Sequence, residues 1–286
     1  MPYPPNEHKV EDLVIKNIPD SVRRSILYTV ANFTVGFLRI EDTPRGKNLA
    51  LLGSGTLVTV NSIHAILTAH HVLKELPRSG GLGLILSERS AAPTISTDGL
   101  RYLAIARGPV DSEGPDLGAV ILSSTIASEL RAKQSFHNLD IQREGLLNEP
   151  PDIKDGLWIV QGFIGERTQE QLGVDGYEKT VAFHELSSSG MVDSGYTVGN
   201  HDYFLLRVSY RGGSTMPRDF GGASGGGLWQ VRLVKRKSDA EITHKRPILS
   251  GVAFYQEPIQ SEETAIKCHG RRSVYEVAYE AIRSAV

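Results

Sequence analysis

The sequence predicts an all-β protein of two antiparallel six-stranded β-barrels followed by a C-terminal α-helix. Short β-branched segments recur along the chain between turn residues, as in successive antiparallel strands. A polar stretch that ends at residues 148–152 interrupts this pattern near the middle, as a linker between two halves would. Residues 273–286 place apolar side chains at helical spacing, which predicts one amphipathic helix at the end. A length of 286 residues suits one large domain or two compact halves.

Three regions follow from this pattern. Residues 1–30 are predicted to form an irregular leader with a short helix that begins at Asp20 or Ser21. The first barrel is expected within residues 31–145, with strands at residues 34–40, 55–60, 64–68, 82–86, 102–106 and 117–122. The second barrel and the terminal helix are expected within residues 146–286, with strands at residues 156–163, 179–183, 203–208, 227–233 and 248–254. Part of the Ser/Gly-rich segment 185–216 is expected to be a mobile loop that gates a cleft or accepts a regulator.

Composition indicates which binding partners and which cellular compartment to expect. A net charge of -2, from 31 basic and 33 acidic residues, predicts no nucleic-acid or membrane partner through bulk attraction. Cys268 is the single cysteine, so no intramolecular disulfide can form, which favours a reducing cytoplasmic location. Early prolines and charges argue against an export signal, and no window approaches the roughly 18 uninterrupted apolar residues of a membrane span.

The densest chemical signal is the run of glycines at residues 221–227, here called the glycine frame, which contains Ala223 and Ser224 and precedes an apolar strand. A nucleophilic serine must be approached by a substrate backbone, and nearby backbone N–H groups must turn toward the developing oxyanion. Both requirements favour residues without a Cβ. On its own, the run would fit a flexible glycine-rich loop better than a nucleophile loop.

Two further residues complete a candidate catalytic triad. His71 follows an apolar strand, and a histidine is the side chain best suited to take the proton of a serine hydroxyl near neutral pH. Asp116 opens the strongly apolar segment 117–122, where its carboxylate could accept the imidazole Nδ1–H and orient the ring. Taken singly, each would more often be structural, a turn aspartate or a surface histidine. Their order with Ser224 favours the triad.

At these residues the chain resembles the trypsin-like (chymotrypsin-fold) serine peptidases. The family's signatures, in the chain order His, Asp, Ser, resemble residues 53–57, 68–71, 116–119 and 222–226. Residues 250–255 resemble the strand that lines the family's substrate cleft, and residues 273–275 resemble its strand before the terminal helix. The family pattern places two residues between Thr68 and the catalytic histidine, which selects His71 over the adjacent His70.

The resemblance implies a serine endopeptidase that hydrolyses peptide bonds through an acyl-enzyme intermediate and needs no cofactor or metal. It implies an oxyanion hole from the backbone N–H groups of Gly222 and Ser224. Its partner would be a protein or peptide substrate, and the need to restrain an intracellular protease leaves room for a regulatory protein partner. The residues expected to bind substrate are Arg218, near the base of the specificity pocket, together with Phe254, Tyr255, Gln256 and Ser273.

The chain departs from the family in three ways. Ala223 stands where trypsins carry an aspartate that pairs with a newly cut N-terminus, so activation by that ion pair is not expected. The disulfides of secreted members are missing. Arg218 lies where trypsin has an acid, so a preference for Lys or Arg at the cleavage site is not expected; an inward Arg218 would favour an acidic side chain, and an exposed loop arginine is the alternative.

Three other interpretations compete. Residues 222–226 also fit the nucleophile elbow of α/β-hydrolases, with Asp239 and His269 following in that fold's order, but the short β-branched segments before them do not alternate with helices. The same barrels could serve as a protein-binding module with an idle triad. A metal site is disfavoured because its potential ligands come as adjacent pairs that cannot easily converge on one ion. Those potential ligands are His70, His71, Cys268 and His269.

Overall fold

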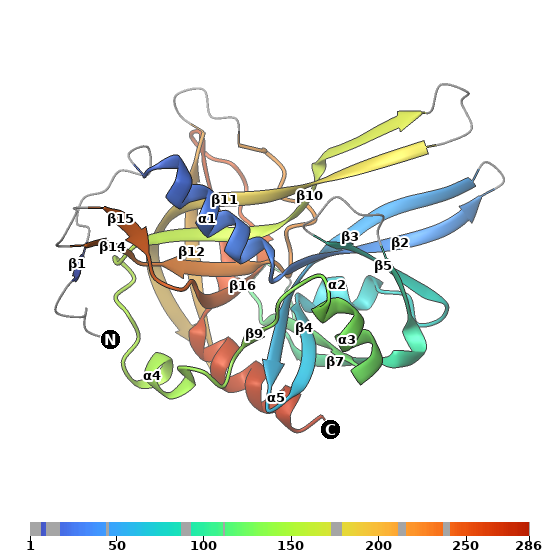
Figure 1. Ribbon diagram of the computed structural model, residues 1–286, viewed down its shortest axis with the longest axis horizontal. Helices are drawn as coiled ribbons and strands as arrows, with labels where there is room; N and C mark the ends of the chain where they lie inside the picture. Colours follow the sequence, from blue (N-terminus) through green and yellow to red (C-terminus); the bar gives the residue numbers. More distant parts are fainter. Residues whose placement is uncertain are drawn as a thin grey trace.

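The computed structural model of the chain describes residues 7–9, 18–43, 46–86, 93–110, 112–172, 179–210, 216–236 and 241–285. It confirms a mostly β protein with helices at its periphery (Figure 1). Two β units account for most of the strands, and the hairpins β2–β3 and β10–β11 extend from them in the same direction. In the described part of the chain, no helix is both long enough and apolar enough to cross a membrane.

The first unit is a curled, open sheet. Helix α1 (Asp20–Ala31) leads into it, close to the predicted position. The strands of this curled sheet are β2 (Thr34–Thr43), β3 (Gly46–Val60), β4 (Ile63–Thr68), β5 (Gly81–Leu86), β6 (Thr94–Ser96), β7 (Leu100–Arg107), β8 (Asp116–Leu122) and β9 (His137–Asn138). Their order is β6-β5-β2-β3-β4-β8-β7, with β9 parallel to β3. A 3-10 turn, η2 (Thr97–Gly99), connects β6 to β7.

The first unit therefore differs from the closed barrel that the sequence predicted. The short strand β6 pairs with β5 alone and β7 pairs with β8 alone among the described residues, so the two edges of the sheet do not join. Apolar side chains from alternating positions, such as Phe37, Leu57 and Ile66, fill the concave side. The unit is a half-barrel with a core of its own.

The second unit is a closed six-stranded barrel, as predicted. Its strands, in the order in which they pair, are β10 (Leu157–Leu172), β11 (Lys179–Val198), β12 (His201–Ser209), β17 (Glu263–His269), β16 (Ile248–Gln256) and β13 (Gly227–Val231). The predicted strand 227–233 ends early, because β14 (Leu233–Arg236) leaves the closed barrel. With β15 (Ile242–His244) and β1 (Glu7–Lys9), β14 forms a separate three-stranded sheet.

Within segment 185–216, β11 continues to Val198 and β12 begins at His201, and residues 211–215 lie outside the described part, so a mobile loop in part of this segment stays a prediction. One expectation for this half was wrong. The predicted strand at 273–275 is instead the start of a π-helical segment, η3 (Ser273–Ala278), which runs into helix α5 (Tyr279–Arg283). The carboxylate of Asp202 accepts from the backbone N–H groups of Arg272 and Ser273, and so satisfies donors that a helix start leaves free.

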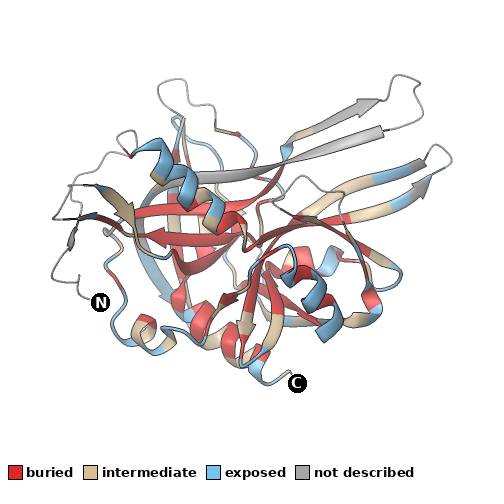
Figure 2. Ribbon diagram, viewed as in Figure 1, coloured by how far each residue is buried: buried red, intermediate tan, exposed pale blue. Residues whose placement is uncertain are grey.

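The predicted terminal helix is confirmed, and it packs against both units. Val274, Ala278 and Ile282 are fully buried in one apolar cluster with residues of the curled sheet and of the closed barrel (Figure 2). Two short helices, α3 (Ser124–Arg131) and α4 (Arg143–Asn148), precede the polar link into β10. The curled sheet and the closed barrel thus share a core along one side, and their contact region is called the seam below.

Candidate active site

His71 and Asp116 are joined by two hydrogen bonds. His71 lies in the first turn of helix α2 (His70–Glu75), directly after β4. Asp116 is the first residue of β8. Its Oδ2 lies 2.5 Å from His71 Nδ1, and its Oδ1 accepts the backbone N–H of His71 at 2.9 Å. One carboxylate therefore sets both the ring and the main chain of this histidine.

The electrostatics keep Asp116 ionised. Burial by itself would raise the pKa of this carboxyl group, but the hydrogen bonds from His71 and its charge together lower the pKa below the usual value. An ionised Asp116 accepts the Nδ1–H and leaves Nε2 of His71 as the proton acceptor. The Asp116 side chain is 4% exposed and that of His71 is 38% exposed, so the carboxylate is enclosed while the imidazole is open to solvent.

Ser224 lies in the glycine frame just before β13, and its Oγ donates to the carbonyl of Phe254 at 3.4 Å. Gly222 and Gly225 have φ of 98° and 90°, which only glycine adopts readily. Within the described residues, the backbone N–H groups of Gly222 and Ser224 have no acceptor, although their neighbours do. The neighbours that donate to acceptors in the protein are Gly221, Ala223, Gly225 and Gly226. Two free donors thus flank the hydroxyl.

Ser54 of β3 connects the glycine frame to the strand that leads to His71. Its backbone N–H donates to the carbonyl of Ser224 at 2.8 Å, and its hydroxyl donates to the carbonyl of Gly222 at 2.7 Å. Its own carbonyl accepts from Thr68 Oγ1 at 2.8 Å, three residues before His71. The hydroxyl also accepts the N–H of Phe163 at 2.8 Å. The bonds to Ser224, Gly222 and Phe163 cross the seam and hold the serine loop against the unit that carries His71 and Asp116.

No role was predicted for Ser54 itself. The residue lay within a motif that carried the family resemblance, between two glycines of an otherwise apolar strand. A small polar residue in that context is the signal that could have identified it, because a fully buried hydroxyl needs partners.

The expected substrate-binding residues fall into different environments. Phe254 is buried and packs against Tyr203 and His269, so only its main chain reaches Ser224. Tyr255 is half-buried. Gln256 donates from Nε2 to the carbonyl of Arg218 at 2.8 Å and accepts the N–H of Phe220 at 3.0 Å. The amide of Gln256 therefore ties residues 218–220, which lead into the glycine frame, to β16.

The side chain of Arg218 is exposed, as in the second of the two alternatives given for it. The expectation for Ser273 needs correction. Ser273 is fully buried, and its hydroxyl donates to Oδ1 of Asp202 at 2.9 Å. Because it starts the terminal helix and is not part of a strand, Ser273 has no surface to offer a substrate.

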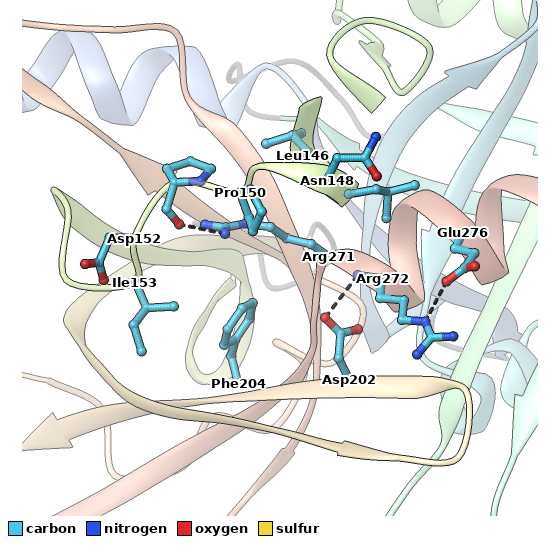
Figure 3. A pocket seen from close by; sticks show the side chains of 12 residues that line it. Leu146, Asn148, Pro150, Asp152, Ile153, Asp202, Phe204, Arg271, Arg272 and Glu276 are labelled. Carbon is cyan, nitrogen blue, oxygen red and sulfur yellow. Dashed lines mark hydrogen bonds and ion pairs between the residues drawn. The ribbon is translucent and has the colours of Figure 1, made fainter. Parts of the chain in front are cut away.

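A cavity of about 650 Å³ lies elsewhere, between the link into β10 and the start of the terminal helix (Figure 3). None of Ser224, His71 or Asp116 lines it. Arg271 on its wall donates to the carbonyl of Pro151 at 2.9 Å and to Ser250 Oγ at 3.2 Å. It also donates to Gln230 Oε1. Arg271 thus ties the link to the closed barrel.

The geometry of the described residues does not match the α/β-hydrolase or the metal-site alternative. Both units are antiparallel apart from the short pairing of β9, unlike the parallel sheet of an α/β-hydrolase. His269 is fully buried beside Asp116, and Asp239 lies outside the described residues. Among the residues that the structure describes, no group of three or more His, Cys, Asp or Glu side chains could hold a metal ion.

Comparisons with known proteins add little to this geometry. No protein-family model matches the chain, and no curated protein matches it. The chain is similar to a solved structure described by the statement that aromatic interactions drive the coupled folding and binding of the intrinsically disordered Sesbania mosaic virus VPg protein. The identity is 12% over 86% of this chain and 95% of that chain, with a TM-score of 0.43. A similarity at that level carries no argument about fold or function.

Proposed function

We propose that the chain is a chymotrypsin-like serine endopeptidase in which Ser224 is the nucleophile, His71 the general base and Asp116 the residue that orients the base. The observation that carries the proposal is the pairing of His71 Nδ1 with the buried Asp116 carboxylate at 2.5 Å, on a strand and helix that Ser54 and Thr68 link to the Ser224 loop. The resemblance of the four sequence motifs supports the same assignment.

In the proposed reaction, Ser224 Oγ attacks the scissile carbonyl while His71 Nε2 takes its proton. The tetrahedral oxyanion is held by the free N–H groups of Gly222 and Ser224. His71 then donates the proton to the leaving amine, and water releases the acyl group from Ser224 with His71 again as base. General base catalysis typically contributes about 10²–10⁴-fold and one oxyanion donor about 10²–10³-fold.

A free strand edge beside Ser224 supports a peptide substrate. Strand β13 pairs with β16 only as far as Val252, whereas β17 pairs with β16 up to Gln256. One edge of Phe254–Gln256 is therefore not covered by β13, and the carbonyl of Phe254 lies 3.4 Å from Ser224 Oγ. An extended peptide could add to this edge through main-chain hydrogen bonds, with its scissile bond near the hydroxyl.

The single cysteine suits action in a reducing cytoplasm.

A fluorophosphonate probe tests the proposal, because only an activated serine reacts with it rapidly. We expect wild-type protein to be labelled at Ser224, as located by mass spectrometry, and Ser224→Ala to remain unlabelled. Asp116→Asn should react roughly 10⁴-fold more slowly, because the ring of His71 is then held in the wrong tautomer. Ser128→Ala, which removes an exposed serine of helix α3, is the matched control and should label as wild type does.

A library of unstructured peptides incubated with the wild type, with Ser224→Ala in parallel, then identifies internal cleavage. Correctly folded wild-type protein that is neither labelled nor cleaves any peptide would contradict the proposal. That result would favour a protein-binding module with an idle triad.

A further inference from the structure

A third contact holds Asp116, and it comes from the other β unit. The backbone N–H of Asp116 donates to Nε2 of His269 at 3.0 Å. Asp116 begins β8 of the curled sheet, and His269 ends β17 of the closed barrel. The carboxylate of Asp116 is thus committed to His71, while its main chain is fixed to the unit that carries Ser224.

The ring of His269 is held as a neutral acceptor. The residue is fully buried, and burial together with the charge of His201 lowers its pKa to about 3, although Asp116 opposes the shift. Because Nε2 accepts from Asp116, the proton of the neutral ring is on Nδ1. That Nδ1 has no hydrogen-bond partner among the described residues. A buried donor without a partner is energetically costly, so hydrogen bonding by Nδ1 does not explain why a histidine lies at this position.

Aromatic packing fixes the plane of this ring. Its centroid lies 4.8 Å from that of Phe254 and 5.3 Å from that of Tyr203, with His201 at 5.9 Å. The titratable groups that face it are Asp116 of β8 and Tyr203 and His201 of β12. Phe254 is also the residue whose carbonyl accepts from Ser224 Oγ. His269 therefore contacts both the acid of the triad and the residue that supports the nucleophile.

We propose that His269 is a positioning residue that holds the His71–Asp116 pair in register with Ser224 across the seam. This inference rests on the proposed hydrolase function. In its absence, Asp116 N–H would have no acceptor from the closed barrel, and the acid and base could shift relative to the hydroxyl. A displacement of about 1 Å is enough to cost on the order of 10²-fold in rate.

Paired substitutions test this role. We expect His269→Leu, which has no acceptor, to lower kcat for a cleaved peptide by about ten- to a hundredfold with little change in KM. His269→Gln, whose Oε1 can accept from Asp116 N–H, should recover most of that loss. Cys268→Ala is the control, since this fully buried neighbour on β17 makes no bond to Asp116. It should lower the melting temperature without lowering kcat.

The Asp116 amide gives a readout that does not require activity. Its hydrogen exchange should be slow in wild type and in His269→Gln, and faster in His269→Leu. If His269→Leu does not fold, His269→Asn replaces it, because the shorter amide cannot reach Asp116 as Gln can. Equal kcat in Gln and Leu (or Asn) variants, or a loss of kcat in Cys268→Ala as large as in His269→Leu, would overturn the inference. Unlabelled wild-type protein would instead count against the hydrolase function, while amide exchange still reports the contact.

Discussion

At the scale of single residues, Ser54 shows how a buried hydroxyl can organise a site. It is fully buried, and its hydroxyl, N–H and carbonyl each have a partner, so no polar atom of the residue is left unpaired. Across the seam from it, Gly225 of the glycine frame has no room for a side chain, because a Cβ there would collide with the carbonyl oxygen of Ser54. The close approach of β3 to the glycine frame thus depends on small residues.

Removing this hydroxyl should affect both stability and reactivity. Ser54→Ala leaves the Gly222 carbonyl and the Phe163 N–H without their partner, which should lower the free energy of unfolding by roughly 1–3 kcal/mol. Because the Gly222 carbonyl belongs to the peptide unit beside the proposed oxyanion donors, we expect fluorophosphonate labelling to slow about tenfold or more. Urea unfolding and labelling kinetics measure the two effects.

Thr56→Val is the control for this prediction. It removes a different bond across the seam, from Thr56 Oγ1 to the carbonyl of Gly225 at 3.3 Å, with little change in shape. It should lose stability but keep its labelling rate. A folded Ser54→Ala protein that labels as fast as wild type would show that the hydroxyl is structural only.

At the scale of elements, the sequence predicted strands where β-branched residues lie between turns, and it failed where that signal was weak. Strand β17 contains Glu263 and Lys267 and was not predicted. The Ser/Gly-rich part of β11 has low strand propensity and forms a strand because β10 pairs with it. Helix α2 was not predicted, because its six residues are too few to show a helical period.

Gln256 connects two elements in a way that can be tested. Gln256→Ala should free residues 218–220 from β16, so we expect slower labelling of Ser224, by about three- to tenfold if one or two hydrogen bonds of ordinary strength are lost. Faster cleavage by an added protease near residues 216–220 should accompany it. Labelling kinetics and mass spectrometry of the fragments report both effects.

Gln256→Glu refines this comparison. The glutamate keeps an acceptor for Phe220 N–H but loses the donor to the Arg218 carbonyl. It should therefore fall between wild type and Gln256→Ala. If all three proteins label and resist proteolysis equally, the amide of Gln256 does not hold this segment.

At the scale of the whole molecule, two buried histidines link stability to pH. Burial lowers the pKa of both His137 and His269 to about 3, below the ordinary value of 6.5. The unfolded chain therefore binds more protons than the native protein between these values. Stability should be complete above pH 6.5 and fall as the pH drops toward 3, by up to about 1.4 kcal/mol per pH unit for each histidine.

Urea unfolding between pH 7 and pH 4.5 measures this slope. His137→Gln removes one of the two groups, so its slope should be shallower by the contribution of one histidine. A free energy of unfolding that stays level over this range in wild type would contradict the prediction.

The candidate triad also belongs to this largest scale, because its residues lie on two units. Chain order and residue type were enough to propose Ser224, His71 and Asp116. The residues that hold them, Ser54 and His269, could not be recognised in the same way, because each acts through a partner far away in the sequence. Hydrogen bonds across the seam produce no periodic pattern in the sequence.

The division of these residues between two units has a consequence for the protein during its own synthesis. A ribosome makes His71 and Asp116 first, and strand β17 and the terminal helix come only after the serine loop. A nascent chain that ends before residue 224 has a base and an acid but no alcohol. One that ends before β17 cannot close the barrel that supports the loop. The proposed activity would thus arise only after β17 has been made, well after its base and acid.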